Sequence, residues 1–183
     1  MDQKQESQWI NDLQDPSRRS KAFGQLVKLY QQPLYWHIRK MVLSHDDAND
    51  ILQNTFMKAW AALDSFRGDS KLSTWLFRIA VNEALTFLSN QREKLNVSME
   101  ELQESLANQL ESDPYFSGDE MQLKLQKAIL SLPQKQRLVF NMKYFDDLTY
   151  EEMEQILGTS VGALKASYHY AVKKIEQFML SDI

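Results

Sequence analysis

Apolar residues in this chain recur at steps of three and four, and no run of alternating apolar and polar residues interrupts that spacing. The clearest stripe comprises Ala48, Ile51, Leu52, Thr55, Phe56, Ala59 and Leu63. Such spacing places side chains on one face of a helix. Helical spacing resumes at Leu72 after a short loop rich in Gly, Asp and Ser, residue types that favour turns. Glycine and proline number only five and four among 183 residues, so the sequence predicts an all-α protein.

Composition narrows the class of protein further. The chain has no cysteine, which excludes disulfides and Cys-ligated zinc and suits a reducing compartment. No apolar run reaches the roughly 20 residues that a membrane span needs, and the polar start lacks the apolar core of a signal peptide. We therefore expect a cytoplasmic protein without membrane insertion.

Enzyme chemistry is not indicated by any motif. His37 and His45 have no companion ligands at helical spacing, so we expect ordinary surface or boundary residues and no metal site. The chain also lacks a nucleophile motif, a glycine-rich phosphate loop and a paired-carboxylate signature. We expect no cofactor and no catalytic residue.

The distribution of charge divides the chain into three parts. The formal net charge is -4, and residues 95–120 carry seven carboxylates and no Lys or Arg. This composition predicts a solvated acidic linker between a helical domain at residues 1–94 and a second at residues 121–183. Two DNA elements about 20 base pairs apart lie about 70 Å apart, so the linker must be extended if both domains bind DNA together.

A helix-turn-helix is predicted in the second domain. Thr149 is a strong N-cap, and Glu152 three residues later completes a capping box. The short helix that follows ends at Gly158, and a longer amphipathic helix begins after Ser160. Small residues at the start of the longer helix permit close approach to bases, while Lys165 can meet phosphate. An ordinary helical hairpin is the alternative interpretation.

Aromatic and polar residues gather at the start of the helix that follows the first-domain loop. Trp75 and Phe77 offer ring faces, Arg78 a guanidinium and Asn82 an amide. Rings stack on unpaired bases at roughly 1–3 kcal/mol each, so this mixture suits melted nucleic acid. Aromatic residues at helical spacing are also common in cores, which remains the alternative for each ring.

Two sets of motifs together resemble a known family. The segments QNTFMKAW (residues 53–60), FRGDS (66–70) and TWLFRIAVN (74–82) resemble the second domain of bacterial RNA polymerase sigma factors of the extracytoplasmic-function (ECF) group. The segments LPQKQR (132–137), LTYEE (148–152) and SVGALK (160–165) resemble the fourth sigma domain. The resemblance covers nearly the whole chain in the right order and implies two small helical domains joined by the linker.

The resemblance implies three binding surfaces. The surface for core RNA polymerase, at its β′ clamp helices, would comprise Asp47, Asp50, Gln53, Asn54, Lys58 and Trp60. The surface for the melted −10 element would comprise Phe66, Arg67, Gly68, Asp69, Ser70, Lys71, Trp75, Phe77, Arg78 and Asn82. The surface for the −35 element would comprise Ser160, Gly162, Ala163, Lys165, Ala166, Ser167 and Tyr170. Other implied partners are the polymerase β flap and an anti-sigma factor.

Some positions depart from the family pattern. Many relatives carry Glu where this chain has Asn54, so one negative contact to the polymerase is missing. Arginines are usual where this chain has Ser167 and Tyr170, so bidentate readout of guanine is not available there. We expect weak DNA binding by the isolated chain and promoter specificity mainly in the holoenzyme; tight, specific duplex binding by the free chain would contradict this.

Two other classes of protein compete with this reading. A conventional helix-turn-helix regulator would need a symmetric dimer, and the sequence has no heptad seam for one. A helical adaptor would use the two domains only to dock proteins. Substitution of Trp75 and Lys165 should abolish transcription by a sigma factor and leave the docking of an adaptor intact.

Overall fold

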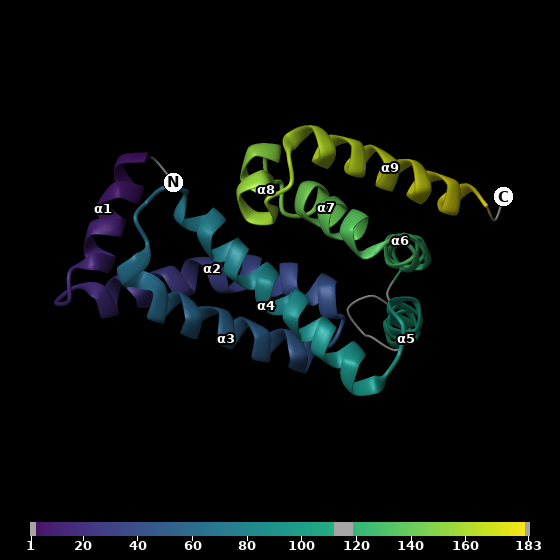
Figure 1. Cartoon of the computed structure of the whole chain (residues 1–183), viewed down its shortest axis with the longest axis horizontal. Helices are drawn as coiled ribbons and strands as arrows, with labels where there is room; N and C mark the ends of the chain where they lie inside the picture. The colour runs from purple at the N-terminus through teal and green to yellow at the C-terminus, as the bar shows by residue number, and fades with distance from the viewer. Residues whose placement is uncertain (1–2, 112–118, 182–183) are drawn as a thin grey trace.

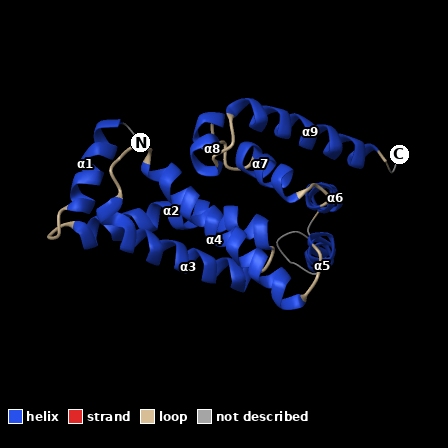
Figure 2. Ribbon diagram, in the orientation of Figure 1, coloured by secondary structure: helices blue, strands red, loops and turns tan. Residues whose placement is uncertain are grey.

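The computed structural model describes residues 3–111 and 119–181, and within these ranges it contains helices and no strand (Figures 1 and 2). The first half comprises α1 (Gln3–Gln14), α2 (Arg19–Val42), α3 (His45–Ala62), the 3-10 turn η1 (Leu63–Ser65) and α4 (Leu72–Leu95). The second half comprises α5 (Met99–Glu111), α6 (Glu120–Leu130), α7 (Gln134–Tyr144), α8 (Tyr150–Leu157) and α9 (Val161–Leu180). The prediction of an all-α protein is confirmed.

Helices α2, α3 and α4 form the N-terminal bundle, with α1 across one end (Figure 1). Leu26, Leu34 and Leu76 are fully buried between these helices. The α1 helix is fixed by polar contacts, because Trp9 Nε1 donates to the carbonyl of Ala22 at 3.2 Å. The backbone N–H of Leu72 donates to the Glu6 carboxylate at 2.6 Å, so α1 also caps the start of α4.

The boundaries inside the bundle follow from local chemistry. Helix α2 runs through Pro33 without a break. The left-handed backbone of Leu43 (φ 59°) ends α2. Ser44 then caps α3 by accepting a hydrogen bond from the Asp47 N–H at 3.2 Å, as its position predicts.

Much of the acidic segment is helical, which corrects the expectation of a solvated coil. Leu102, Leu106 and Leu110 in α5 recur every four residues, and each is at most 3% exposed. This apolar stripe packs toward the core, and α5 lies against α6. A leucine stripe with helical spacing outweighs the acidic composition, because its burial offsets the entropy lost on ordering. Residues 112–118 of the predicted linker lie outside the described ranges.

The C-terminal helices surround a small core of their own. Its buried members are Ala128, Ile129, Leu132, Phe140, Ala171 and Ile175. Met121 in the first turn of α6 is 64% exposed, because it lies ahead of the residues that pack on α9. The capping box of Thr149 and Glu152 is present, so the predicted start of α8 is confirmed.

The two sets of helices pack together as two layers (Figure 1). Helix α8 lies on α4, and α7 lies on α2. The core of the N-terminal bundle therefore continues into Leu138, Met142 and Met153 of the C-terminal layer. Every helix within the described residues is too short or too polar to cross a membrane.

Candidate nucleic-acid interface

The outer face of α3 gathers the residues predicted to bind the polymerase. The inner face is buried through Ala48, Ile51, Thr55 and Ala59. Of the predicted residues, Asp50, Gln53, Asn54, Lys58 and Trp60 are exposed and Asp47 is half-buried. Amphipathic spacing alone therefore presents these side chains together on the surface.

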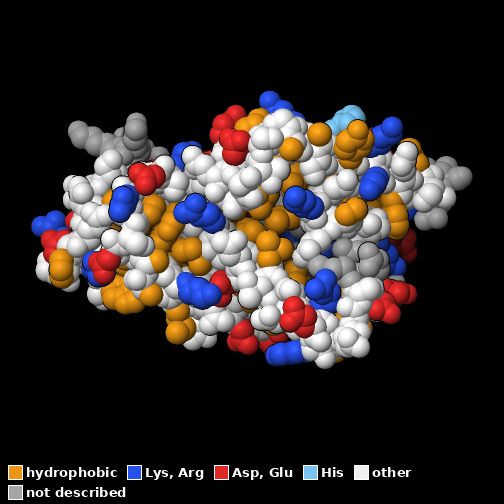
Figure 3. All heavy atoms as spheres, in the orientation of Figure 1, with side chains coloured by type: hydrophobic (Ala, Val, Ile, Leu, Met, Phe, Trp, Pro, Cys, Tyr) orange, Lys and Arg blue, Asp and Glu red, His pale blue; other side chains and the backbone are white. Residues whose placement is uncertain are grey.

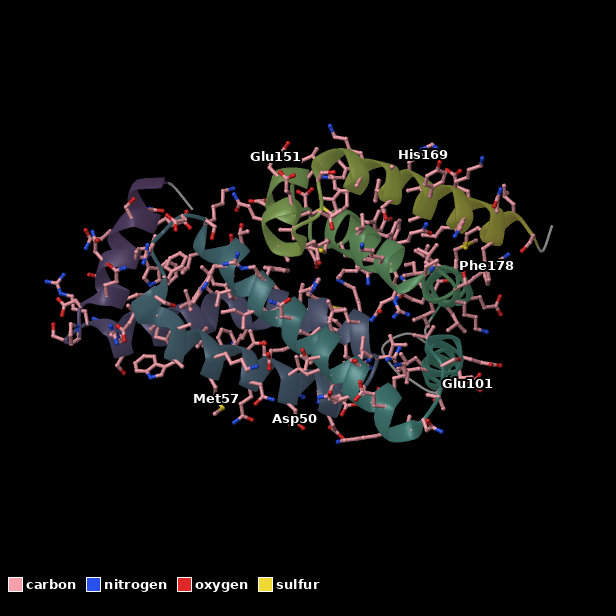
Figure 4. All side chains as sticks on the ribbon, in the orientation of Figure 1. Asp50, Met57, Glu101, Glu151, His169 and Phe178 are labelled. Atoms are coloured by element: carbon pink, nitrogen blue, oxygen red, sulfur yellow. The ribbon has the colours of Figure 1, made fainter. Side chains whose placement is uncertain are left out.

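Met57 was not predicted to belong to this face, and it lies there beside the predicted Trp60. Met57 is 62% exposed, and Figure 4 shows Met57 and Asp50 both directed away from the bundle. Trp60 is 44% exposed and meets the ring of Phe23 edge to face at 5.0 Å between centroids. An exposed methionine and indole on a polar face are typical of protein contact surfaces. The apolar character of Met57 at an outer position was the signal that could have identified it.

The loop before α4 is anchored to α1 on one side and is largely exposed on the other. The side-chain amide of Gln14 donates to the carbonyl of Phe66 at 3.0 Å. Gly68 adopts a left-handed conformation (φ 77°) that glycine accommodates without strain. Arg67, Gly68, Asp69 and Lys71 are exposed, and Ser70 is half-buried. The loop therefore presents polar groups of both charges at the surface.

The aromatic residues near this loop face inward. Phe66 and Trp75 are each 7% exposed, with ring centroids 4.8 Å apart. Phe77 is 5% exposed and meets the ring of His37 at 5.2 Å. These ring faces are therefore not open to bases in this arrangement, because the rings complete the core of the bundle. Arg78 and Asn82 on the same helix are exposed; base contact by any of the five stays a prediction.

The start of α9 is exposed as the helix-turn-helix pattern predicts. Gly158 (φ 65°) closes the turn after α8, and the Ser160 hydroxyl accepts from the Ala163 N–H at 3.4 Å. Of the predicted residues, Ser160, Gly162, Ala163, Lys165, Ala166 and Tyr170 are exposed and Ser167 is half-buried. The N-terminal half of α9 therefore offers small side chains and one cation to the solvent.

Sequence reasoning missed a basic and aromatic cluster beside α9. The ammonium groups of Lys143 and Lys165 lie 5.4 and 5.7 Å from the ring centroid of Tyr150. Both distances lie within the range of cation–π attraction. The cluster joins α7, α8 and α9, so only the fold brings its members together. The cluster therefore places two cations next to the start of α9.

Two hollows lie between the layers, beside the places where the layers are in contact. One has a volume of about 510 Å³ and lies between α4 and the C-terminal helices, with Leu85, Leu138, Val139 and Leu164 in its wall. The other has a volume of about 620 Å³ and lies between the loop before α4 and the start of α8. Figure 3 shows hydrophobic side chains gathered between the layers near the middle of the visible face.

The second hollow carries an ion pair between the layers. Lys71 Nζ lies 2.7 Å from the Glu152 carboxylate. Burial alone would raise the pKa of Glu152, but hydrogen bonds from Lys71 and Thr149 outweigh it and hold that pKa below its ordinary value. The same hydrogen bond raises the pKa of Lys71. Within the described residues no group of His, Asp and Glu is arranged to hold a metal ion.

Comparison with known proteins agrees with this architecture. Residues 26–94 match the family model "Sigma-70 region 2", and residues 122–175 match "Sigma-70, region 4". An ECF RNA polymerase sigma-E factor from Escherichia coli (strain K12) is 34% identical over 164 residues, covering 85% of each chain. The ECF RNA polymerase sigma factor SigW from Bacillus subtilis (strain 168) is 31% identical over 156 residues, covering 81% of this chain and 83% of SigW.

Two solved structures are similar over both domains. The sigma factor RpoE from Bartonella quintana, in complex with the anti-sigma factor NepR, is 25% identical with a TM-score of 0.68, covering 89% of this chain and 99% of that one. CnrH, in complex with the cytosolic domain of CnrY, is 26% identical with a TM-score of 0.68, covering 96% and 98%. The bundle and helix-turn-helix thus define a protein of the sigma-70 class.

This chain belongs to the ECF group of RNA polymerase sigma factors. It directs promoter-specific initiation of transcription.

Proposed function

We propose that this sigma factor uses three separate surfaces to bind core polymerase and two promoter elements at once. The observation that carries the proposal is the exposed start of α9 in a helix-turn-helix on the same chain as the exposed loop before α4. The chain itself performs no covalent chemistry. Its role is to select the promoter and hold the open strand, after which the polymerase joins nucleotides.

The outer face of α3 binds the β′ clamp helices of the core enzyme. Support comes from the exposure of Asp50, Asn54 and Trp60 on one side of a well-anchored helix. Trp60 and Met57 supply the apolar area, and the polar residues around them fix the orientation. The C-terminal domain binds the β flap, which places α9 near the upstream DNA.

The loop at residues 66–71 and the exposed side of α4 hold the melted −10 element. Arg67, Lys71 and Arg78 supply positive charge for the backbone, and Asn82 can hydrogen-bond a base edge. The buried rings of Phe66 and Trp75 pack against each other and hold the start of the loop on the bundle. Base stacking on these rings requires that they become exposed when the strand melts.

The start of α9 enters the major groove of the −35 element. Gly162, Ala163 and Ala166 allow the helix backbone to approach base edges closely. Lys165, together with Lys143 beside it, contacts phosphate. Since this helix offers no arginine, contacts from several surfaces must combine to give promoter specificity.

An anti-sigma factor binds between the two layers. Support comes from the 510 Å³ hollow lined by Leu85, Leu138 and Leu164, an apolar recess flanked by both DNA-binding domains. The solved relative RpoE is described in complex with an anti-sigma factor, and CnrH in complex with the cytosolic domain of CnrY. A helix in this recess would prevent the domains from separating.

Transcription in vitro tests the proposed function. Core polymerase is supplied with fragmented genomic DNA from the source bacterium, with and without this protein, and new transcript starts are mapped. We expect discrete starts that share a two-part upstream motif. Folded protein and active core that yield no new starts would contradict the proposal.

A further inference from the structure

A buried cluster of a histidine, a lysine and a carboxylate joins the two layers, and none of its three members belongs to the proposed surfaces. His37 Nδ1 on α2 lies 2.5 Å from Asp146 Oδ2 in the turn after α7, and the two side chains are 0% and 6% exposed. Lys40, one turn further along α2, places Nζ 3.7 Å from Asp146 Oδ1 and 4.4 Å from the ring centroid of Phe145. Separating the layers would take Asp146 away from both His37 and Lys40 and break this buried ion pair, so the contact favours the closed arrangement.

The turn that carries Asp146 is held rigidly. The N–H of Asp146 donates to the carbonyl of Asn141 at 3.3 Å, and the N–H of Leu148 donates to that of Met142 at 3.1 Å. Asp147 between them adopts a left-handed backbone (φ 51°) and is exposed. Two hydrogen bonds and a left-handed residue therefore aim the Asp146 carboxylate at α2, whereas its neighbour points to solvent.

Among the described residues, the polar partner of the His37 side chain is the Asp146 carboxylate. The His37 Nε2 is buried and has no hydrogen-bond partner among the described residues. The ring lies against Phe77 on its other side. Within the described structure, the polar contact of His37 is thus with the opposite layer, which indicates that this buried imidazole holds the layers together.

The packing of the two layers also covers the loop before α4, which we propose binds DNA. Residues Gly68, Asp69, Ser70 and Lys71 share the 620 Å³ hollow with Thr149, Glu151, Glu152 and Gln155 of the α8 start. Lys71 is engaged by Glu152, and Glu151 is exposed at the same end of α8 (Figure 4). Glu6 of α1 also lines this hollow, and the two carboxylates of α8 add to its negative charge beside the loop. Because they repel a phosphate backbone, α8 opposes DNA binding in this arrangement.

We propose that the free chain inhibits itself by closing, with His37, Lys40 and Asp146 as a latch between the domains. The inference rests on the proposed function, because it takes the loop before α4 as the −10 surface. Opening the latch removes α8 from the loop and allows the domains to separate. Because the domains must separate to contact the clamp helices and the flap together, only the open molecules bind core polymerase fully. The apparent affinity therefore equals the intrinsic affinity multiplied by the open fraction, and it rises when the latch opens.

Distance measurements on the free chain test the latch. The chain has no cysteine, so Lys21→Cys and Gln177→Cys place one spin label on an exposed site of each domain. The test variant is Asp146→Asn, and its control is Asp147→Asn, which removes the same charge from an exposed neighbour and keeps a residue that tolerates the left-handed backbone. The native chain and the control should give one narrow, short distance distribution.

Asp146→Asn should add a longer and broader population. The same variant should bind core polymerase about tenfold more tightly, because more molecules are open. Circular dichroism and urea unfolding report whether the variant folds. If it does not fold, Glu152→Gln replaces it, since that change removes the ion pair with Lys71 and keeps the acceptor for the helix cap; a smaller shift in the same direction is expected.

Equal distance distributions for the native chain, the test variant and the control would overturn the latch. If the labelled chain opens on Asp146→Asn but polymerase affinity does not rise, self-inhibition is overturned. The distance measurement needs no polymerase, so it separates the two proposals. A chain that never supports transcription refutes the proposed function, whereas one that supports transcription but does not open refutes only the latch.

Discussion

Lys165 is the cation that stands at the start of α9, in contact range of the Tyr150 ring. We predict that Lys165→Ala lowers holoenzyme affinity for a promoter with an intact −35 element several-fold and reduces the salt dependence of binding by about one unit of slope, as expected for one lost phosphate contact. The measurement is a salt titration of promoter binding. Lys173→Ala, an exposed lysine later in the same helix, is the control; equal effects of the two changes would refute the assignment.

Glu152 links the cap of α8 to Lys71, and its lowered pKa makes that link depend on pH. A lowered pKa contributes stability that is present above the ordinary value of 4.5 and is lost as pH falls through the lowered value. We therefore predict that the native chain exceeds Glu152→Gln in stability by about 0.5 kcal/mol near neutral pH, as for a partly screened pair. Urea unfolding of both chains from pH 7 to pH 3 should show the difference vanish; a difference that grows on acidification would contradict it.

Arg137 is a buried charge without an ion-pair partner in the described part of the chain. It is 4% exposed, and burial lowers the pKa of its guanidinium to about 10. Replacing a buried charge with an apolar residue of similar length is often neutral or stabilising by about 1–4 kcal/mol. We predict this outcome for Arg137→Met in urea unfolding. A loss above about 2 kcal/mol would show that the guanidinium makes a net favourable contribution.

At the scale of elements, the helix-turn-helix depends on the backbone of Gly158. An added Cβ there would meet no atom within 4 Å, but the φ of +65° is a conformation that a residue such as alanine adopts only with strain. Gly158→Ala should therefore cost about 1 kcal/mol of unfolding free energy. Gly24→Ala is the matched control, because Gly24 lies inside α2 with open space around it; it should stabilise by about 0.5–1 kcal/mol. If both substitutions lower the unfolding free energy, or both raise it, this explanation of Gly158 is contradicted.

Local elements could be predicted where short-range chemistry decides them. The capping box of Thr149 and Glu152 acts within three residues, so sequence spacing reveals it. The start of α5 carried the same signal, because Ser98 and Glu101 exchange two hydrogen bonds there. The acidic composition around them obscured it, since it favoured a solvated linker over a helix that buries leucines.

Contacts between distant segments could not be predicted. His37 was expected to be an ordinary surface or boundary residue, yet it is fully buried and pairs with Asp146, 109 positions away. The inward orientation of Trp75 and Phe77 has the same origin, because helical spacing alone does not decide which face of α4 another element covers. The family motifs located the candidate surfaces, and the packing decides which of their side chains are accessible.

At the scale of the whole molecule, the two DNA-binding domains must act at a fixed separation. In the closed arrangement α8 lies on α4, so simultaneous binding of two elements about 70 Å apart requires the domains to separate on the polymerase. The polymerase then sets the distance and the relative rotation of the two surfaces. Each added base pair moves the elements apart by about 3.4 Å and rotates them by about one tenth of a turn.

A promoter spacer series tests this account most directly. Holoenzyme is given templates that keep both mapped elements and differ only in the number of base pairs between them, and transcript yield is measured. We predict a narrow optimum, with yield falling about tenfold or more when two base pairs are added or removed, because one element is then shifted by about 7 Å and rotated by about a fifth of a turn relative to its surface. Yield that stays level across the series would contradict simultaneous recognition of two elements by one chain.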